Sequence, residues 1–263
     1  VGVFFSNVTI SYWINHDPLP HKSDKLFFPR LASFPFDCGK CEAHRILSYR
    51  DITKLSNTDI PSAKAAMYRS GGYARLDAQH LASPVNIRFT QRDFFRLFDV
   101  PVLAGQIWPD NNARHEVILS RKFAQKLFGD DQAVGKDQVV GKDILLDDRP
   151  LKIIAVLDDW EMAPKLFDPN ADGYHEPMED VYAPLELGYD LNYMSNSQVS
   201  FHEAINFKKL STEGREKSMH QLQFWVQLDT PEQQAAYRQF MKNLVADEKA
   251  AGRHPSPDAS SLY

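Results

Sequence analysis

Two cysteines separated by two residues are the side chains whose spacing could most directly do chemistry. Cys38 and Cys41 frame Gly39 and Lys40, and such a pair can form a disulfide, a redox-active dithiol or part of a zinc site. A redox site normally follows a strand and opens a helix, whereas a proline-containing loop precedes this pair. Zinc would need His44 and one further ligand. We therefore predict a local disulfide in an oxidising compartment, with reduced thiols as the second alternative and metal ligation as the third.

Acidic side chains form a second group, in the segment that follows residue 157. Their oxygens could bind Ca²⁺, but they lack the regular spacing and the fixed glycine of a calcium-binding loop. We expect a solvated acidic loop there and predict no metal site. The residues concerned are Asp158, Asp159, Glu161, Asp168 and Asp172.

Aromatic side chains in the same part of the chain could form a binding surface. Large amphipathic side chains are common anchors of protein interfaces, although core packing explains most of the tryptophans and tyrosines of this chain equally well. Those between residues 158 and 194 are predicted to be exposed and to contact a partner. They are Trp160, Tyr174, Tyr182, Tyr189 and Tyr193.

Motifs typical of enzymes are missing from the sequence. The nine histidines are scattered without a His-Glu-x-x-His pattern, and no Gly-x-Ser-x-Gly elbow or phosphate-binding Gly-Lys-Ser/Thr loop occurs. The net charge is −5 with both signs interspersed, so no basic face is concentrated enough to follow a nucleic acid backbone. We predict no catalytic residue, no cofactor and no nucleic acid partner.

The composition is that of a folded domain. Of the 263 residues, 43% are hydrophobic and 25% are charged, which differs from a disordered or fibrous chain. No apolar run approaches the length of about 20 residues that a membrane helix needs. The chain opens at Val1 without the pattern of a signal peptide, and we interpret it as a fragment of a longer protein.

The hydrophobic pattern predicts short strands alternating with helices. Apolar residues alternate with polar ones along a half-buried strand and recur every three or four positions along a helix, while proline, glycine and capping residues mark the ends. Residues 158–194 resemble a long decorated loop containing one strand, and residues 252–263 a frayed end. The predicted strands are 1–14, 26–28, two or three segments within 63–90, 115–119, 144–146, 151–156, 181–185 and 221–228, and the predicted helices are 48–55, 94–98, 120–128 and 231–248.

Several short segments are weak motifs singly but specific in their order. They are Asp17–Pro20 with Asp24–Leu26, Phe94–Gly105, Val117–Ser120, Phe128–Asp130, Val140–Leu146 and Arg149–Val156. In this order they resemble the extracytoplasmic domain of MacB-like and FtsX-like ABC transporter permeases. The resemblance covers about residues 17–187 and 222–245. The Cys38–Cys41 segment, a duplicated Gly-Lys-Asp stretch and a long insert between Leu187 and Met219 depart from the family pattern.

The resemblance implies an α+β fold with two subdomains. A porter-like subdomain of strands and helices would comprise residues 1–97 and 218–263. A second, sabre-like subdomain of irregular mixed α/β structure would be inserted as residues 98–217.

The resemblance also implies a function without catalysis. Such a domain lies in the periplasm or outside the cell, between membrane helices of a bacterial inner membrane permease. It couples motion driven by ATP to export or to a partner outside the membrane, while the ATPase is a separate domain or subunit. The expected partners are the protein's own transmembrane helices, an ABC ATPase, a periplasmic protein or peptide, and a second copy in a homodimer.

A free-standing secreted protein that binds a ligand or a metal is the alternative. The features that support this alternative are the acidic segment, the cysteine pair and the aromatic residues. Membrane helices flanking the domain in the parent protein would favour the permease, because a secreted binder carries its own export signal instead.

Overall fold

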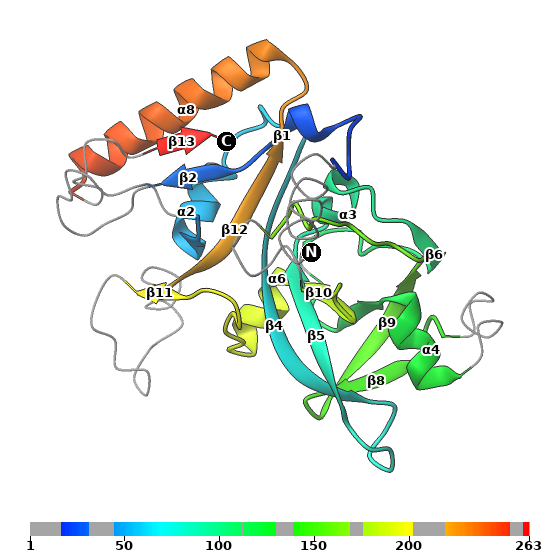
Figure 1. Ribbon diagram of the computed structural model, residues 1–263. Coiled ribbons are helices and arrows are strands. Elements are labelled where there is room, and N and C mark those ends of the chain that lie inside the picture. The colour runs from blue at the N-terminus through cyan, green and yellow to red at the C-terminus, as the bar shows by residue number, and fades with distance from the viewer. Residues whose placement is uncertain are drawn as a thin grey trace, which may run out of the picture.

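Strands dominate the computed structural model, which describes residues 17–31, 45–111, 113–129, 139–168, 176–201, 219–252 and 260–262 (Figure 1). The strands are β1 (Leu26–Phe27), β2 (Pro29–Leu31), β3 (Leu47–Ser48), β4 (Ala63–Arg75), β5 (Ser83–Thr90), β6 (Val102–Gly105), β7 (Glu116–Leu119), β8 (Asp143–Leu146), β9 (Arg149–Leu157), β10 (Val181–Pro184), β11 (Ser200–Phe201), β12 (Met219–Gln227) and β13 (Ser260–Leu262). The helices are the 3-10 helix η1 (Ser23–Lys25), α2 (Tyr49–Leu55), α3 (Asp93–Leu97), α4 (Arg121–Phe128), α6 (Leu185–Asp190) and α8 (Pro231–Ala250). The fold is therefore mixed α/β.

One mixed sheet of 11 strands runs through the molecule. Its order is β1-β12-β4-β5-β10-β7-β9-β6, with β3 and β11 added to β12 and β8 joining β4 and β9. The pairs β5/β10 and β7/β9 are parallel. The sheet crosses the predicted subdomain boundary, because β5 of the porter-like part pairs with β10 of the sabre-like part.

The β4–β5 ribbon joins the two ends of this sheet (Figure 1). Residues 63–67 of β4 pair with β12, whereas Ala74 and Arg75 pair with β8. Gly71 and Gly72 lie inside β4 and not in a turn between strands. A Cβ on Gly72 would lie 2.8 Å from Oδ2 of Asp147 and 2.9 Å from Cδ1 of Ile87. Close packing against these two side chains, and not a turn, therefore favours a glycine at position 72.

The sheet buries a different layer on each face, because side chains of a strand alternate between faces. The helix face carries Ala66, Tyr68, Ile87, Phe89, Leu222 and Phe224 and is covered by residues of α2, α4, α6 and α8. The aromatic face carries Ala65, Met67, Ile118 and Tyr182 and is covered by α3 together with Met162 and Phe167 of the segment 158–168. That segment has no helix or strand of its own.

Local signals place several helices where the sequence predicts them. Ser48 caps α2 in a capping box with Asp51, and Thr230 caps α8 in the same way with Gln233. These side chains satisfy backbone N–H groups that a helix leaves without partners in its first turn. Gly129 ends α4 with a φ of +89°, a conformation that favours glycine. The strands at 26–28, 115–119, 144–146, 151–156, 181–185 and 221–228 are also confirmed, with shifted ends.

Two predictions about irregular segments are wrong. The segment 158–194 contains α6 in addition to the expected strand, and its apolar residues Leu185 and Leu187 are buried in the helix face. The C-terminal tail was expected to fray, but β13 pairs with β2 in a separate two-stranded sheet beside α8 (Figure 1). Long-range pairing orders residues 260–262, which no local pattern reveals. The predicted strand 1–14 lies outside the described residues.

Candidate functional site

No metal or redox centre is formed by the residues that the structure describes. Within those ranges, no three or more His, Cys, Asp or Glu side chains are grouped so that they could hold a metal ion. Cys38 and Cys41 lie outside the described residues, so their predicted disulfide stays a prediction. Among the described helices, none combines the length and apolarity that crossing a bilayer requires.

The acidic residues of the segment 158–168 separate into two sets. Asp158 and Asp159 both accept from Nη1 of Arg121 on α4, at 2.9 and 3.2 Å. Asp168 turns into the protein and is 2% exposed. Asp172 lies outside the described residues. The acidic loop is thus solvated at one end and buried at the other, which the sequence analysis did not anticipate.

The aromatic residues predicted to be exposed do not form one surface. Tyr182 and Tyr189 are only 1% and 3% exposed, so the prediction that these two are exposed is wrong. Trp160 and Tyr193 are half-buried, and Tyr174 lies outside the described residues. Tyr182 sits in β10 and Tyr189 in α6, where burial in the core leaves them no surface to offer.

These aromatic residues lie on opposite sides of the sheet. Trp160 and Tyr182 both contact Phe94 on the aromatic face, with ring centroids 6.1 and 5.8 Å away. Tyr193 contacts Phe89 at 4.9 Å on the helix face, where its hydroxyl donates to Asp147. Burial and this hydrogen bond raise the pKa of Tyr193. The structure therefore assigns these side chains mainly to packing.

A buried ion network lies on the aromatic face. Nη2 of Arg88, on β5, donates to Asp168 at 2.6 Å and to Glu179 at 2.5 Å. Nζ of Lys165 donates to Glu179 at 3.0 Å, and the amide of Gln223 on β12 donates to Asp168 at 2.9 Å. None of the five residues is more than 4% exposed. The network joins two strands to the segment 158–168 and to Glu179, which lies two residues before β10.

Opposite charges stabilise one another inside this network. Burial by itself would raise the pKa of Asp168, but the charge of Arg88 and the hydrogen bonds from Arg88 and Gln223 outweigh it and lower the pKa to about 2. Burial also opposes the charge of Arg88, yet Asp168 and Glu179 raise its pKa overall. For Lys165, burial dominates and lowers the pKa. The two cations and two anions leave no net charge in the network.

The sequence analysis missed this network. Arg88 alternates with Val85, Ile87 and Phe89 in a strand pattern, and a charged residue in that register is normally expected to face water. No local pattern marks this position, because β5 is covered on both faces only once it lies between β4 and β10 in the folded sheet. Only the folded chain brings Asp168 and Glu179 over that position.

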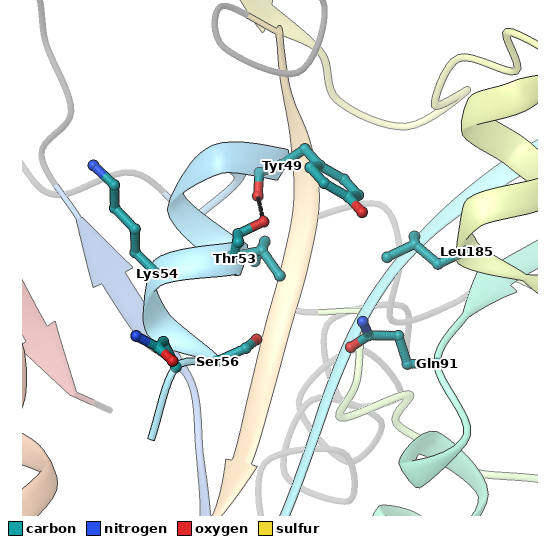
Figure 2. A pocket seen from close by; sticks show the side chains of 8 residues that line it. Tyr49, Thr53, Lys54, Ser56, Gln91 and Leu185 are labelled. Carbon is teal, nitrogen blue, oxygen red and sulfur yellow. Dashed lines mark hydrogen bonds between the residues drawn. The ribbon is translucent and has the colours of Figure 1, made fainter. Parts of the chain in front are cut away.

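A pocket of about 410 Å³ lies between α2 and α6 (Figure 2). Tyr49, Thr53, Ser56, Gln91 and Leu185 are among its lining residues. The hydroxyl of Tyr49 donates to Glu186 of α6 at 2.6 Å, which ties the two helices together. The charged lining residue is Lys54, and it pairs with Glu248 of α8. The pocket offers hydroxyl, amide and apolar groups, and the charged groups beside it are engaged in these contacts, which suits binding or packing.

A second pocket of about 630 Å³ lies where β7 and β9 end. Arg121 and Lys122 of α4 line one part of it, and Asp159, Trp160 and Asp180 line another. Burial raises the pKa of Asp180. Arg121 pairs with Asp158 and Asp159, but carboxylates outnumber cations among the lining residues, so the pocket is acidic.

Comparison with known proteins identifies what the chain is similar to. A family model described as the MacB-like periplasmic core domain matches residues 12–244. None of the curated proteins compared with the chain matches it.

Solved structures share the fold at low sequence identity. The periplasmic region of MacB from Actinobacillus actinomycetemcomitans is 11% identical, with a TM-score of 0.54 over 93% of this chain and 91% of that one. The extracellular domain of the noncanonic ABC-type transporter YknZ from Gram-positive bacteria is 16% identical, with a TM-score of 0.51 over 90% and 99%. A domain of a putative permease protein from Porphyromonas gingivalis is 16% identical, with a TM-score of 0.53 over 91% and 90%.

Proposed function

Because the chain belongs to the MacB-like periplasmic core domain family, we propose that it transmits motion driven by ATP to export or to a partner outside the membrane. The chain is the extracytoplasmic domain of a MacB-like ABC transporter permease, and such a domain is a non-catalytic transporter component. The observation that carries the proposal is the family match over residues 12–244. A free-standing secreted binder is not favoured.

The transmitting element in this proposal is the sheet. Residues 1–97 and 218–263 would form the porter-like subdomain and residues 98–217 the inserted sabre-like subdomain. The β4–β5 ribbon supports a mechanical link between them, because it is hydrogen-bonded to β12 at one end and to β8 at the other. A continuous ladder of backbone hydrogen bonds transmits displacement better than a flexible linker does.

The pairing of β13 with β2 supports attachment to two neighbouring membrane helices. These strands come from opposite ends of the described chain and lie side by side. A domain inserted between two helices of one bundle needs both of its connections on the same side, which this pairing provides.

The partners in this proposal are the membrane helices of the parent protein, a separate ABC ATPase and a second copy of the permease. A periplasmic protein or peptide would bind outside the membrane of a bacterial inner membrane transporter. Trp160, Tyr174 and Tyr193 stay candidates for such a contact. The half-buried positions of Trp160 and Tyr193 are compatible with it.

Distance measurements on the complete transporter test the proposal. Spin labels at Lys126 on α4 and Lys242 on α8, both exposed, would report the separation of the two subdomains. We expect the distance distribution to differ between the nucleotide-free transporter and the transporter trapped with ATP and vanadate. A control pair at Asp24, an exposed residue just before β1, and Lys242 lies within the porter-like part and should not change. Identical distributions in both states for the first pair would contradict the coupling.

A further inference from the structure

A third pocket, of about 430 Å³, lies between α3 and the two ends of β6. β6 is the last strand in the order of the sheet, so the pocket lies at the edge of the sheet. Its volume is within the range of sites that hold small organic ligands, roughly 300–1,000 Å³. The residues that line it are Arg92, Asp93, Phe95, Arg96, Val100 and Ile107.

The floor of this pocket is apolar and already in place. Phe95 and Val100 are buried, and Ile107 packs against the same core on the aromatic face. The ring of Phe95 stands edge-on to the ring of Trp108, with centroids 5.2 Å apart. The backbone N–H of Val100 donates to the carbonyl of Phe95 at 2.9 Å. The floor can therefore receive a hydrocarbon group without being rebuilt.

The single carboxylate of the lining is already bound within the protein. Oδ2 of Asp93 accepts from the backbone N–H of Lys64 at 3.1 Å and from Nη2 of Arg96 at 3.4 Å. Nη2 of Arg96 also donates to the carbonyl of Ser62. Two cations and one anion line the pocket, and the anion is paired with one of the cations.

Arg92 is the cation that has no acid beside it. Its backbone N–H donates to the side chain of Asn111 at 2.8 Å, which fixes the position of the residue. Among the residues that the structure describes, its half-buried guanidinium forms no ion pair. Arg92 and Arg96 are four positions apart in helical backbone, so both side chains lie on one side of α3. An unpaired guanidinium therefore stands next to an apolar floor.

We propose that this pocket binds an organic anion whose charged group is joined to an apolar chain. The guanidinium of Arg92 donates two parallel hydrogen bonds to the carboxylate or phosphate oxygens of the ligand. The apolar chain of the ligand lies on Phe95, Val100 and Ile107. This inference concerns a binding site of the domain and does not depend on the proposed coupling.

A methyl NMR titration of the unaltered 263-residue chain tests both parts of the ligand. The probes are octanoate, acetate and the neutral amphiphile octyl glucoside below its micelle concentration. Octanoate should shift the methyl signals of Val100 and Ile107 saturably and leave those of Leu222 unchanged. From butyrate to octanoate, binding should tighten by about fourfold for each CH₂ that the pocket buries. Equal affinity for acetate or octyl glucoside would overturn the proposal.

Removing the charge of Arg92 tests the anionic part. Arg92→Gln keeps the backbone contact with Asn111 and should weaken octanoate binding by about tenfold or more, because the paired hydrogen bonds are lost. Arg238→Gln removes an exposed arginine of α8, and this matched control should bind like the unaltered chain. The same loss in both variants would mean a general attraction of anions to the surface, which contradicts a site.

Vesicle sedimentation distinguishes a free amphiphile from an anionic lipid headgroup. Binding to phosphatidylglycerol vesicles that is absent with phosphatidylcholine and lost in Arg92→Gln would support the site and identify a lipid headgroup as the source of the anion. Octanoate binding without vesicle binding would support the site and identify a free amphiphile. If neither octanoate nor the vesicles bind in a manner that depends on Arg92, the proposal is wrong.

Discussion

The two faces of the sheet are held by different forces. The helix face is packed almost wholly with apolar side chains from four helices, and hydrocarbon burial is non-directional. The aromatic face holds the irregular segment 158–168 through the buried ion network. A helix satisfies its own backbone, whereas an irregular segment has no repeating bonds to define its position. Directional polar bonds therefore fix the position of the segment that has no secondary structure of its own.

Removing the central cation should break the aromatic face most severely. Arg88→Ala leaves Asp168 and Glu179 buried without their main partner, and loss of one member of a buried pair costs about 4 kcal/mol. Urea denaturation would measure the free energy of unfolding. Lys152→Ala is the control, because the side chains of Lys152 and its partner Asp143 are 54% and 62% exposed, and loss of such a surface pair should cost about 1 kcal/mol or less. Equal losses in the two variants would show that the network contributes no more than a surface pair.

Truncating an apolar side chain on the helix face should lower the free energy of unfolding by a smaller amount. Leu222 on β12 is fully buried, and Leu222→Ala should lower the free energy of unfolding by about 3 kcal/mol through lost burial and a cavity. The loss should be the same at pH 7 and at pH 3, since no titrating group is removed. A loss that changed with pH would mean that the two faces are coupled and not independent.

Acid should weaken the aromatic face selectively. The pKa of Asp168 is lowered to about 2 from its ordinary value of 3.8, so its folded form binds protons less readily than its unfolded form. The resulting stabilisation, about 2 kcal/mol, is complete above pH 4 or so and is lost as the pH falls towards about 2. Thermal unfolding measured across this range should show the loss in the unaltered chain and in Leu222→Ala. The Asp168→Asn variant should lack this component of the slope.

Removing a helix cap should produce the smallest effect. Thr230 accepts from the backbone N–H of Gln233 at 3.2 Å, and Thr230→Ala should cost about 1 kcal/mol. Hydrogen exchange should rise in the first turn of α8, on the helix face, and stay unchanged in the segment 161–168. Thr230→Ser retains the hydroxyl and serves as the control. A rise in exchange on the aromatic face would show that the cap affects the whole sheet.

Some elements follow from residues that are neighbours in the sequence. Helix ends are set by the capping boxes at Ser48 and Thr230 and by the glycine that ends α4. These signals act within three or four positions, so the ends of these helices can be predicted without tertiary information. The alternation in β12 is equally local. Its apolar residues Leu222, Phe224 and Val226 are indeed all buried in the helix face.

Other features depend on contacts between distant segments. Tyr182 and Tyr189 are of a residue type that often anchors interfaces, but they lie in a strand and a short helix whose side chains are buried in the core. Glycine is common in turns, but Gly72 lies inside a strand, where the side chain of Asp147, far along the chain, packs against it. Arg88 occupies an ordinary polar position in the alternating pattern of β5. Its partners Asp168 and Glu179 come from positions 80 and 91 residues away.

The alternation of strands and helices and the helix caps can be predicted from the sequence, because they depend on short-range periodicity and local hydrogen bonding, and the order of the short motifs indicates the permease family. Which strands share one sheet, which face each side chain occupies and where the four buried charges meet become visible only in the folded chain. The physical reason is that burial and ion pairing depend on which groups the fold brings within a few ångströms, whatever their separation along the chain.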